Sequence, residues 1–225
     1  MKVKEPTMSD NNTPSLAWEE GAGWLVFSGS VDTLSDVRAQ ALNRMIPEGD
    51  IVYIGVDEDS AEELIEDMGE LGAPTGFMVN VLVEDDQSIM DQVSAAALIV
   101  IPAEIDPRDM QAVLSGVGLE AIKIAYQLGA VVLIEGRSTT IFGKVYAVDD
   151  IGYDGFDWVR DALILPDVVA VAESDLARDA LGAEAVDVAI GIGAGSALVL
   201  GRGGVIEAWG EKQVSVLFSG RRIDK

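Results

Sequence analysis

The stretch AVVLIEGRSTTIFGKV, residues 130–145, decides the fold class of this chain. It opens with an apolar run, reaches Gly136, and continues through Ser138 into a segment that predicts the start of a helix. Apolar runs without alternation are typical of strands that are buried on both faces of a parallel sheet. We therefore expect a tight turn between a buried strand and a helix, with Ser138 on that turn. We call this turn, around Gly136 to Ser138, the elbow.

The same order of strand and helix repeats on the N-terminal side of this stretch. Apolar runs predict strands at 23–29, 50–56, 76–83, 97–102 and 130–136. Helical spacing of apolar residues predicts helices at 32–46, 60–72, 86–96 and 107–128. Ser60 and Glu63 have the spacing of a capping box at the start of the second helix, and Gly116 interrupts the last one. This alternation predicts an α/β fold with a mainly parallel sheet flanked by helices.

The pattern changes beyond about residue 150. Two further strands are predicted at 168–172 and 186–192, with a helix at 174–182 between them. Three short apolar runs then follow at 196–201, 204–210 and 213–220. The turns between these runs are too short for crossover helices, so they predict an antiparallel C-terminal meander. We expect one domain over residues 21–225, preceded by a flexible tail over residues 1–20.

The composition restricts the partners and the chemistry. The net charge of −24, from 39 acidic and 15 basic residues, argues against binding to nucleic acid or to an anionic membrane surface. It would attract a cationic peptide or protein partner, but a solvated acidic surface is the preferred explanation, and adaptation to high salt is a third one. The chain contains no cysteine and no histidine, which excludes zinc and copper sites of the usual kind but leaves a carboxylate-only magnesium or calcium site open. We expect no cofactor. No signal peptide or membrane-spanning segment is visible, which predicts a cytoplasmic protein.

Four segments, taken in order, resemble one protein family. They are GWLVFSGS (23–30), LGAVVLIEGRSTTIFG (128–143), ALILPDVVAVAESD (162–175) and IGIGAGSALVLGRGGVIEAWG (190–210). Their order and spacing resemble the cyanophycinases, peptidase family S51, which have a class I glutamine-amidotransferase-like fold. The resemblance implies a three-layer, flavodoxin-like arrangement, a homodimer, and a nucleophile position at Ser138.

The chain also departs from the pattern of that family. The family pairs its serine with a histidine, whereas this chain has Glu173 near the corresponding position. Thr139 and Thr140 replace the small residues that follow the family's serine, and IPAEIDP (101–107) replaces a glycine-rich stretch of its substrate site. A serine hydroxyl without a base is a poor nucleophile. These departures indicate a degenerate member that has lost its peptidase machinery.

Three functions follow from these observations. The first is a non-catalytic protein with a binding or structural role. The second is a serine hydrolase of peptides or small amides, in which Glu173, Lys123 or Glu135 replaces the histidine as the base for Ser138. The third is a small-anion binder, in which Arg137, Thr139 and the backbone amides of the elbow hold the ligand.

Overall fold

The computed structural model describes residues 16–30, 35–46, 49–56, 61–103 and 105–220. Its centre is a seven-stranded sheet in which the five predicted N-terminal strands run parallel to one another. In spatial order the strands are β11 (Val205–Gly210), β10 (Ser196–Gly201), β1 (Trp24–Ser28), β5 (Val131–Ile134), β4 (Leu98–Ile101), β2 (Ile51–Gly55) and β3 (Gly76–Asn80). The predicted α/β fold with a mainly parallel sheet is confirmed.

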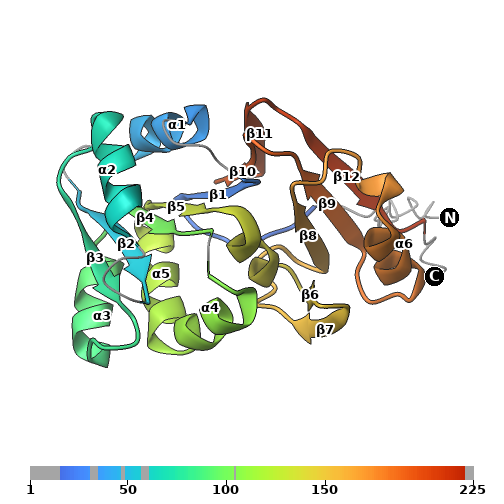
Figure 1. Ribbon diagram of the computed structural model, residues 1–225, viewed down its shortest axis with the longest axis horizontal. Helices are drawn as coiled ribbons and strands as arrows, with labels where there is room; N and C mark the ends of the chain where they lie inside the picture. Colours follow the sequence, from blue (N-terminus) through green and yellow to red (C-terminus); the bar gives the residue numbers. More distant parts are fainter. Residues whose placement is uncertain (1–15, 31–34, 47–48, 57–60, 104, 221–225) are drawn as a thin grey trace, which may run out of the picture.

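Helices cover both faces of this sheet and give the domain three layers (Figure 1). One face is covered by α1 (Asp36–Arg44) and α2 (Glu62–Glu70). The other face is covered by α3 (Asp86–Ser94), α4 (Pro107–Leu114) and α5 (Val117–Leu128). Successive side chains of a strand point to opposite faces of the sheet. The central strands therefore contribute side chains to two separate hydrophobic cores and are buried on both sides. Their sequences are therefore continuous apolar runs.

Local sequence signals explain where several helices begin and end. The side chains of Ser35, Asp85 and Asp106 accept hydrogen bonds from backbone N–H groups in the first turns of α1, α3 and α4. Gly116, with a φ of +95°, separates α4 from α5, so the predicted interruption of the helix over 107–128 is confirmed. The capping box predicted at Ser60 lies outside the described residues.

A second, three-stranded sheet lies beside the large sheet, at the right of Figure 1. It consists of β8 (Ala162–Pro166), β9 (Val188–Ile192) and β12 (Val214–Phe218), with β9 in the middle. β9 pairs parallel to β8 and antiparallel to β12. The side chains on one face of β9 join the main core, and α6 (Asp175–Gly182) packs against the opposite face of this sheet.

The strand predicted at 168–172 is wrong. The chain turns at Asp167, which has a φ of +61°, and then forms a short 3-10 helix, η2 (Val171–Glu173). The carboxylate of Asp167 accepts hydrogen bonds from both the backbone N–H and the hydroxyl of Ser30, at 2.7 and 2.5 Å. These bonds tie the turn to the loop after β1, so the apolar run after Asp167 does not continue β8.

The antiparallel pairing predicted for the C-terminal region is confirmed for β10 and β11. The meander itself is wrong at its last strand, because β12 leaves the large sheet and pairs with β9 instead. A two-stranded ribbon, β6 (Val145–Val148) and β7 (Ile151–Asp154), connects the elbow segment to the second sheet and was not predicted.

Part of the predicted N-terminal tail lies against the domain. Trp18 forms an antiparallel bridge with Val159, and the backbone N–H of Glu19 donates to the carbonyl oxygen of Trp158 at 2.7 Å. Residues 1–15 lie outside the described residues.

Candidate functional site

The turn after β5 depends on Gly136. This residue has a φ of +51°, in the left-handed region that favours glycine. A Cβ atom at position 136 would lie 2.7 Å from the Cβ of Ala103, which is closer than real Cβ atoms approach. The segment that follows is a 3-10 helix, η1 (Gly136–Phe142). Glycine at position 136 therefore permits both the sharp turn and the close packing of the elbow against the end of β4.

Ser138 lies inside the protein. Its residue surface is 0% exposed, and its Oγ donates a 2.5 Å hydrogen bond to the carbonyl oxygen of Pro102. Its backbone N–H donates to the carbonyl oxygen of Glu135 at 3.2 Å. The side chain therefore ties η1 to the segment after β4, and in this arrangement its hydroxyl does not reach solvent.

The backbone of Ser138 differs from that of a nucleophile elbow. In such an elbow the nucleophile itself occupies the strained position between strand and helix, which projects its Oγ into the site. At this turn Gly136 has a positive φ angle, whereas the φ angle of Ser138 is not positive. The strained position thus carries no side chain, and the serine two residues later points into the core.

Glu135 is held by an arginine that comes from α1. Nε and Nη2 of Arg38 donate to the two carboxylate oxygens of Glu135 at 2.9 and 2.8 Å, and Nη1 donates to Asp67 at 2.9 Å. Arg38 and Glu135 are buried, with 7% and 1% of their surfaces exposed. Burial acts to lower the pKa of Arg38, but the bonds and charges of Glu135 and Asp67 raise it overall. Both oxygens of Glu135 are thus committed to a buried ion pair.

The other two candidate bases lie on different elements. Glu173 is exposed on η2, a helix that packs with the second sheet. Nζ of Lys123 on α5 pairs with Oε1 of Glu19 at 2.7 Å. Within the described ranges, no hydrogen bond joins Glu173 or Lys123 to Ser138, whose hydroxyl is bonded to Pro102.

The predicted anion-binding residues are also separated from one another. Arg137 is largely exposed, and its Nη2 lies 3.8 Å from Oδ2 of Asp106. Asp106 already receives two bonds from the side chain of Arg108, at 3.0 and 3.2 Å, and these bonds lower its pKa. Thr139 is buried, and its hydroxyl donates to the carbonyl oxygen of Gly136 at 2.8 Å. Arg137 therefore faces a carboxylate, and Thr139 does not present its hydroxyl to solvent.

The late glycine-rich segment closes the space beside the carboxyl end of β1. A Cβ atom on Gly29 would lie 2.4 Å from the carbonyl oxygen of Gly193, so the two backbones are in close contact. The backbone N–H of Gly195 donates to the carbonyl oxygen of Ser30 at 2.7 Å. These glycines therefore serve the packing of backbone against backbone in this region.

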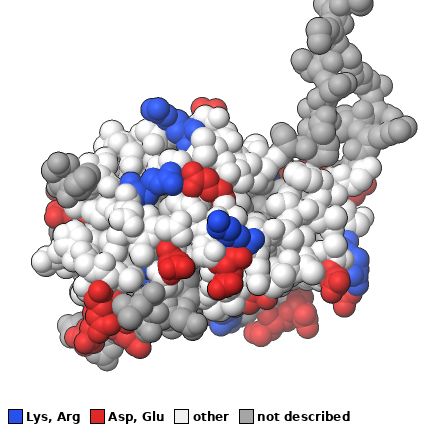
Figure 2. Space-filling model, turned by 90° about the horizontal axis from the view of Figure 1, so that it is seen from above, with Lys and Arg blue, Asp and Glu red and all other residues white. Residues whose placement is uncertain are grey.

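The surface charge is mixed on the face that carries α1 and α2. Figure 2 shows basic side chains as separate groups, several of them next to acidic ones, and acidic side chains mainly along the lower margin of the view. Within the described ranges, none of the helices combines the length and the apolar character that crossing a bilayer requires.

Comparisons with known proteins show which solved structures have a similar fold. No protein-family model and no curated protein sequence matches the chain. Among solved structures it is similar to a peptidase from an acI-B1 Actinobacterium, with a TM-score of 0.66 and 19% identity over 90% of this chain and 97% of that one. It is also similar to a candidate peptidase E from Listeria monocytogenes, with a TM-score of 0.62 and 13% identity over 84% of this chain and 98% of that one. The chain therefore has a peptidase-like fold.

Proposed function

We propose that this chain is a non-catalytic relative of the cyanophycinase-like S51 peptidases and acts by binding. The fold that it shares with two solved peptidases supports the relationship. The absence of histidine from the whole sequence supports the loss of catalysis, because a serine nucleophile needs a base. The observation that carries the proposal is the state of Ser138, which is buried, bonded to Pro102 and displaced from the strained position of the turn.

The competing function is hydrolysis of peptides or small amides at Ser138. It requires the serine to leave the carbonyl oxygen of Pro102, reach solvent, and meet a base within hydrogen-bond distance. Glu135 is bonded through both oxygens to Arg38, and Lys123 is paired with Glu19. Hydrolysis would therefore need both a rearranged elbow and the release or recruitment of a base.

Amide hydrolysis by the wild type and by Ser138→Ala tests the proposal. Peptide p-nitroanilides with acidic, basic and apolar residues before the scissile bond supply the substrates. We expect both proteins to give the rate of the buffer blank. Turnover by the wild type that Ser138→Ala abolishes, with the variant shown to be folded by circular dichroism, would overturn the proposal.

A further inference from the structure

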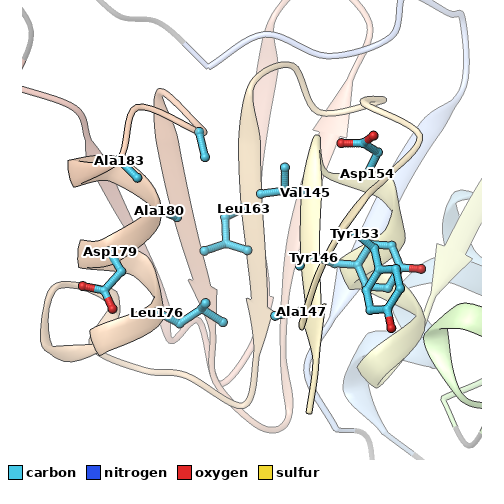
Figure 3. A pocket seen from close by; sticks show the side chains of 12 residues that line it. Val145, Tyr146, Ala147, Tyr153, Asp154, Leu163, Leu176, Asp179, Ala180 and Ala183 are labelled. Atoms are coloured by element: carbon cyan, nitrogen blue, oxygen red, sulfur yellow. The ribbon is translucent and has the colours of Figure 1, made fainter. Parts of the chain in front are cut away.

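An apolar groove of about 590 Å³ lies between α6 and the β6–β7 ribbon (Figure 3). We call it the α6 groove. Leu163 of β8 forms its floor, Val145 and Ala147 of β6 line one wall, and Leu176 and Ala180 of α6 line the other. Leu176 remains 43% exposed although it is a large apolar side chain. The volume and the lining are those of a binding pocket.

The wall formed by the ribbon is fixed from behind. The rings of Tyr146 and Tyr153 point away from the groove (Figure 3) and stack with their centroids 5.3 Å apart. The hydroxyl of Tyr146 donates to Oε1 of Gln111 on α4 at 2.8 Å, and Nε2 of Gln111 donates to the carbonyl oxygen of Asp154 at 2.7 Å. These contacts hold the ribbon wall against α4.

The charged side chains that line the groove are acidic. Asp154 lies on the ribbon wall and Asp179 on the α6 wall, and the twelve lining residues include no lysine or arginine. Two basic side chains of the neighbouring segments are already paired: Lys144 with Asp161 at 2.6 Å, and Arg178 with Asp175. An apolar floor between two carboxylates is complementary to an apolar group that has positive charges on both sides.

We propose that the α6 groove binds a basic segment of a partner protein. A large apolar side chain of that segment lies over Leu163, and lysine or arginine side chains flank it beside Asp154 and Asp179. A second copy of this chain fits less well, because it carries the same net charge of −24. The inference rests on the proposed binding function and names the chemistry of the partner.

A fluorescent peptide of leucine and lysine, roughly 14 residues long so that it can form an amphipathic helix, serves as the probe. Its binding is followed by fluorescence anisotropy at about 0.02 M and about 0.5 M salt, so that screening separates the charged from the apolar contribution. An oligolysine of equal charge tests whether the leucines contribute. Mass spectrometry of the peptide after incubation reports whether it has been cleaved.

Filling the groove tests the apolar contact. Gly152 lines the ribbon wall opposite Ala147, and a Cβ atom there meets no atom within 4 Å. We expect Gly152→Leu to weaken peptide binding about tenfold or more, because the new side chain occupies the groove. Gly69→Leu on α2 is the matched control, since Gly69 also has open space around its Cβ position. It should bind as the wild type does.

Removing the carboxylates tests the charged contacts. The double variant Asp154→Asn with Asp179→Asn should weaken binding about tenfold at low salt and reduce its salt dependence. The variant Glu62→Gln with Glu66→Gln removes two exposed carboxylates from α2 and should leave binding unchanged.

Four outcomes would overturn the groove as the site: no saturable binding by the wild type, equal losses in the matched controls, oligolysine binding as tightly as the leucine-containing peptide, or groove variants that bind like the wild type. In each case an intact peptide leaves the proposed non-catalytic function standing. Cleavage of the peptide by the wild type but not by Ser138→Ala would contradict the proposed function instead.

Discussion

The hydroxyl of Ser138 donates to the backbone carbonyl oxygen of Pro102 across a 2.5 Å contact, and both residues are buried. The bond links the helix after β5 to the segment after β4, two neighbouring strands of the large sheet. A serine used in this way contributes to stability, whereas a nucleophile must be free to meet a substrate. The role of Ser138 can therefore be read from the effect of its removal on folding.

Replacing Ser138 with alanine should destabilise the protein. The carbonyl oxygen of Pro102 would lose its buried donor, at a cost of about 1–3 kcal/mol in the free energy of unfolding. Urea unfolding monitored by circular dichroism measures this change. Thr140→Ala is the matched control, because the Thr140 hydroxyl makes a similar bond to the carbonyl oxygen of Arg137 near the surface. An equal or higher stability of Ser138→Ala would contradict the structural role.

Replacing Arg38 with methionine should be among the most damaging single changes. It removes the arginine that donates to both carboxylate oxygens of buried Glu135, and breaking a buried ion pair from one side costs about 3–5 kcal/mol. Arg160→Met breaks an exposed pair with Glu19 and should cost less than about 1 kcal/mol. Adding Glu135→Met to Arg38→Met should restore much of the stability. A double variant no more stable than Arg38→Met would argue against the loss of this ion pair as the cause.

Gly136→Ala should destabilise the elbow through two separable effects. The left-handed backbone costs about 1–2 kcal/mol for a residue with a Cβ atom, and the contact with Ala103 adds to this. In an Ala103→Gly background the contact is removed, so the same substitution should cost less. Gly152→Ala, in open space and without a positive φ, should be close to neutral. Identical costs in both backgrounds would exclude the contact with Ala103 as a contributor.

Glu207 should contribute to stability in a pH-dependent way. A hydrogen bond from Nε1 of Trp209 at 2.8 Å, followed by the bond from Arg44, lowers the pKa of this carboxyl group. A group with a lowered pKa in the folded state stabilises it above the pKa of the unfolded chain, and this stabilisation is lost as the pH falls through the folded pKa. The stability difference between the wild type and Glu207→Gln should therefore be constant near neutral pH and shrink at acidic pH.

Urea unfolding of both proteins between pH 7 and pH 3 measures that difference. Asp91→Asn, which removes an exposed carboxylate on α3, controls for the change in net charge. A difference between wild type and Glu207→Gln that grows as the pH falls would contradict the assigned sign.

The buried parallel strands could be predicted because their apolar runs are uninterrupted. The runs predicted β1, β2, β4 and β5 within a residue or two of their bounds. The run over 168–172 looked the same, but it failed because its geometry is decided by Asp167 and its bonds to Ser30, 137 residues away in the sequence. The strands β6 and β7 were not predicted. They are short, and they pair only with each other in a ribbon that belongs to neither of the two larger sheets.

The candidate site was less predictable, since the decisive contacts join distant parts of the chain. Ser138 was identified from its place after a strand and a glycine, but the acceptor that holds it, Pro102, lies 36 residues earlier. Arg38 was not singled out, although an arginine between Val37 and Ala41 on the apolar side of its helix was an available signal. Its partner Glu135 lies 97 residues away, so only the fold shows that this carboxylate is already paired.

The central claim is that the elbow serine is inert, and covalent labelling tests it most directly. The wild type and Ser138→Ala are incubated with a fluorophosphonate probe, and their intact masses are measured with circular dichroism as the check on folding. The account predicts no mass increase in the folded wild type. A single adduct on the wild type that is absent from Ser138→Ala would contradict it.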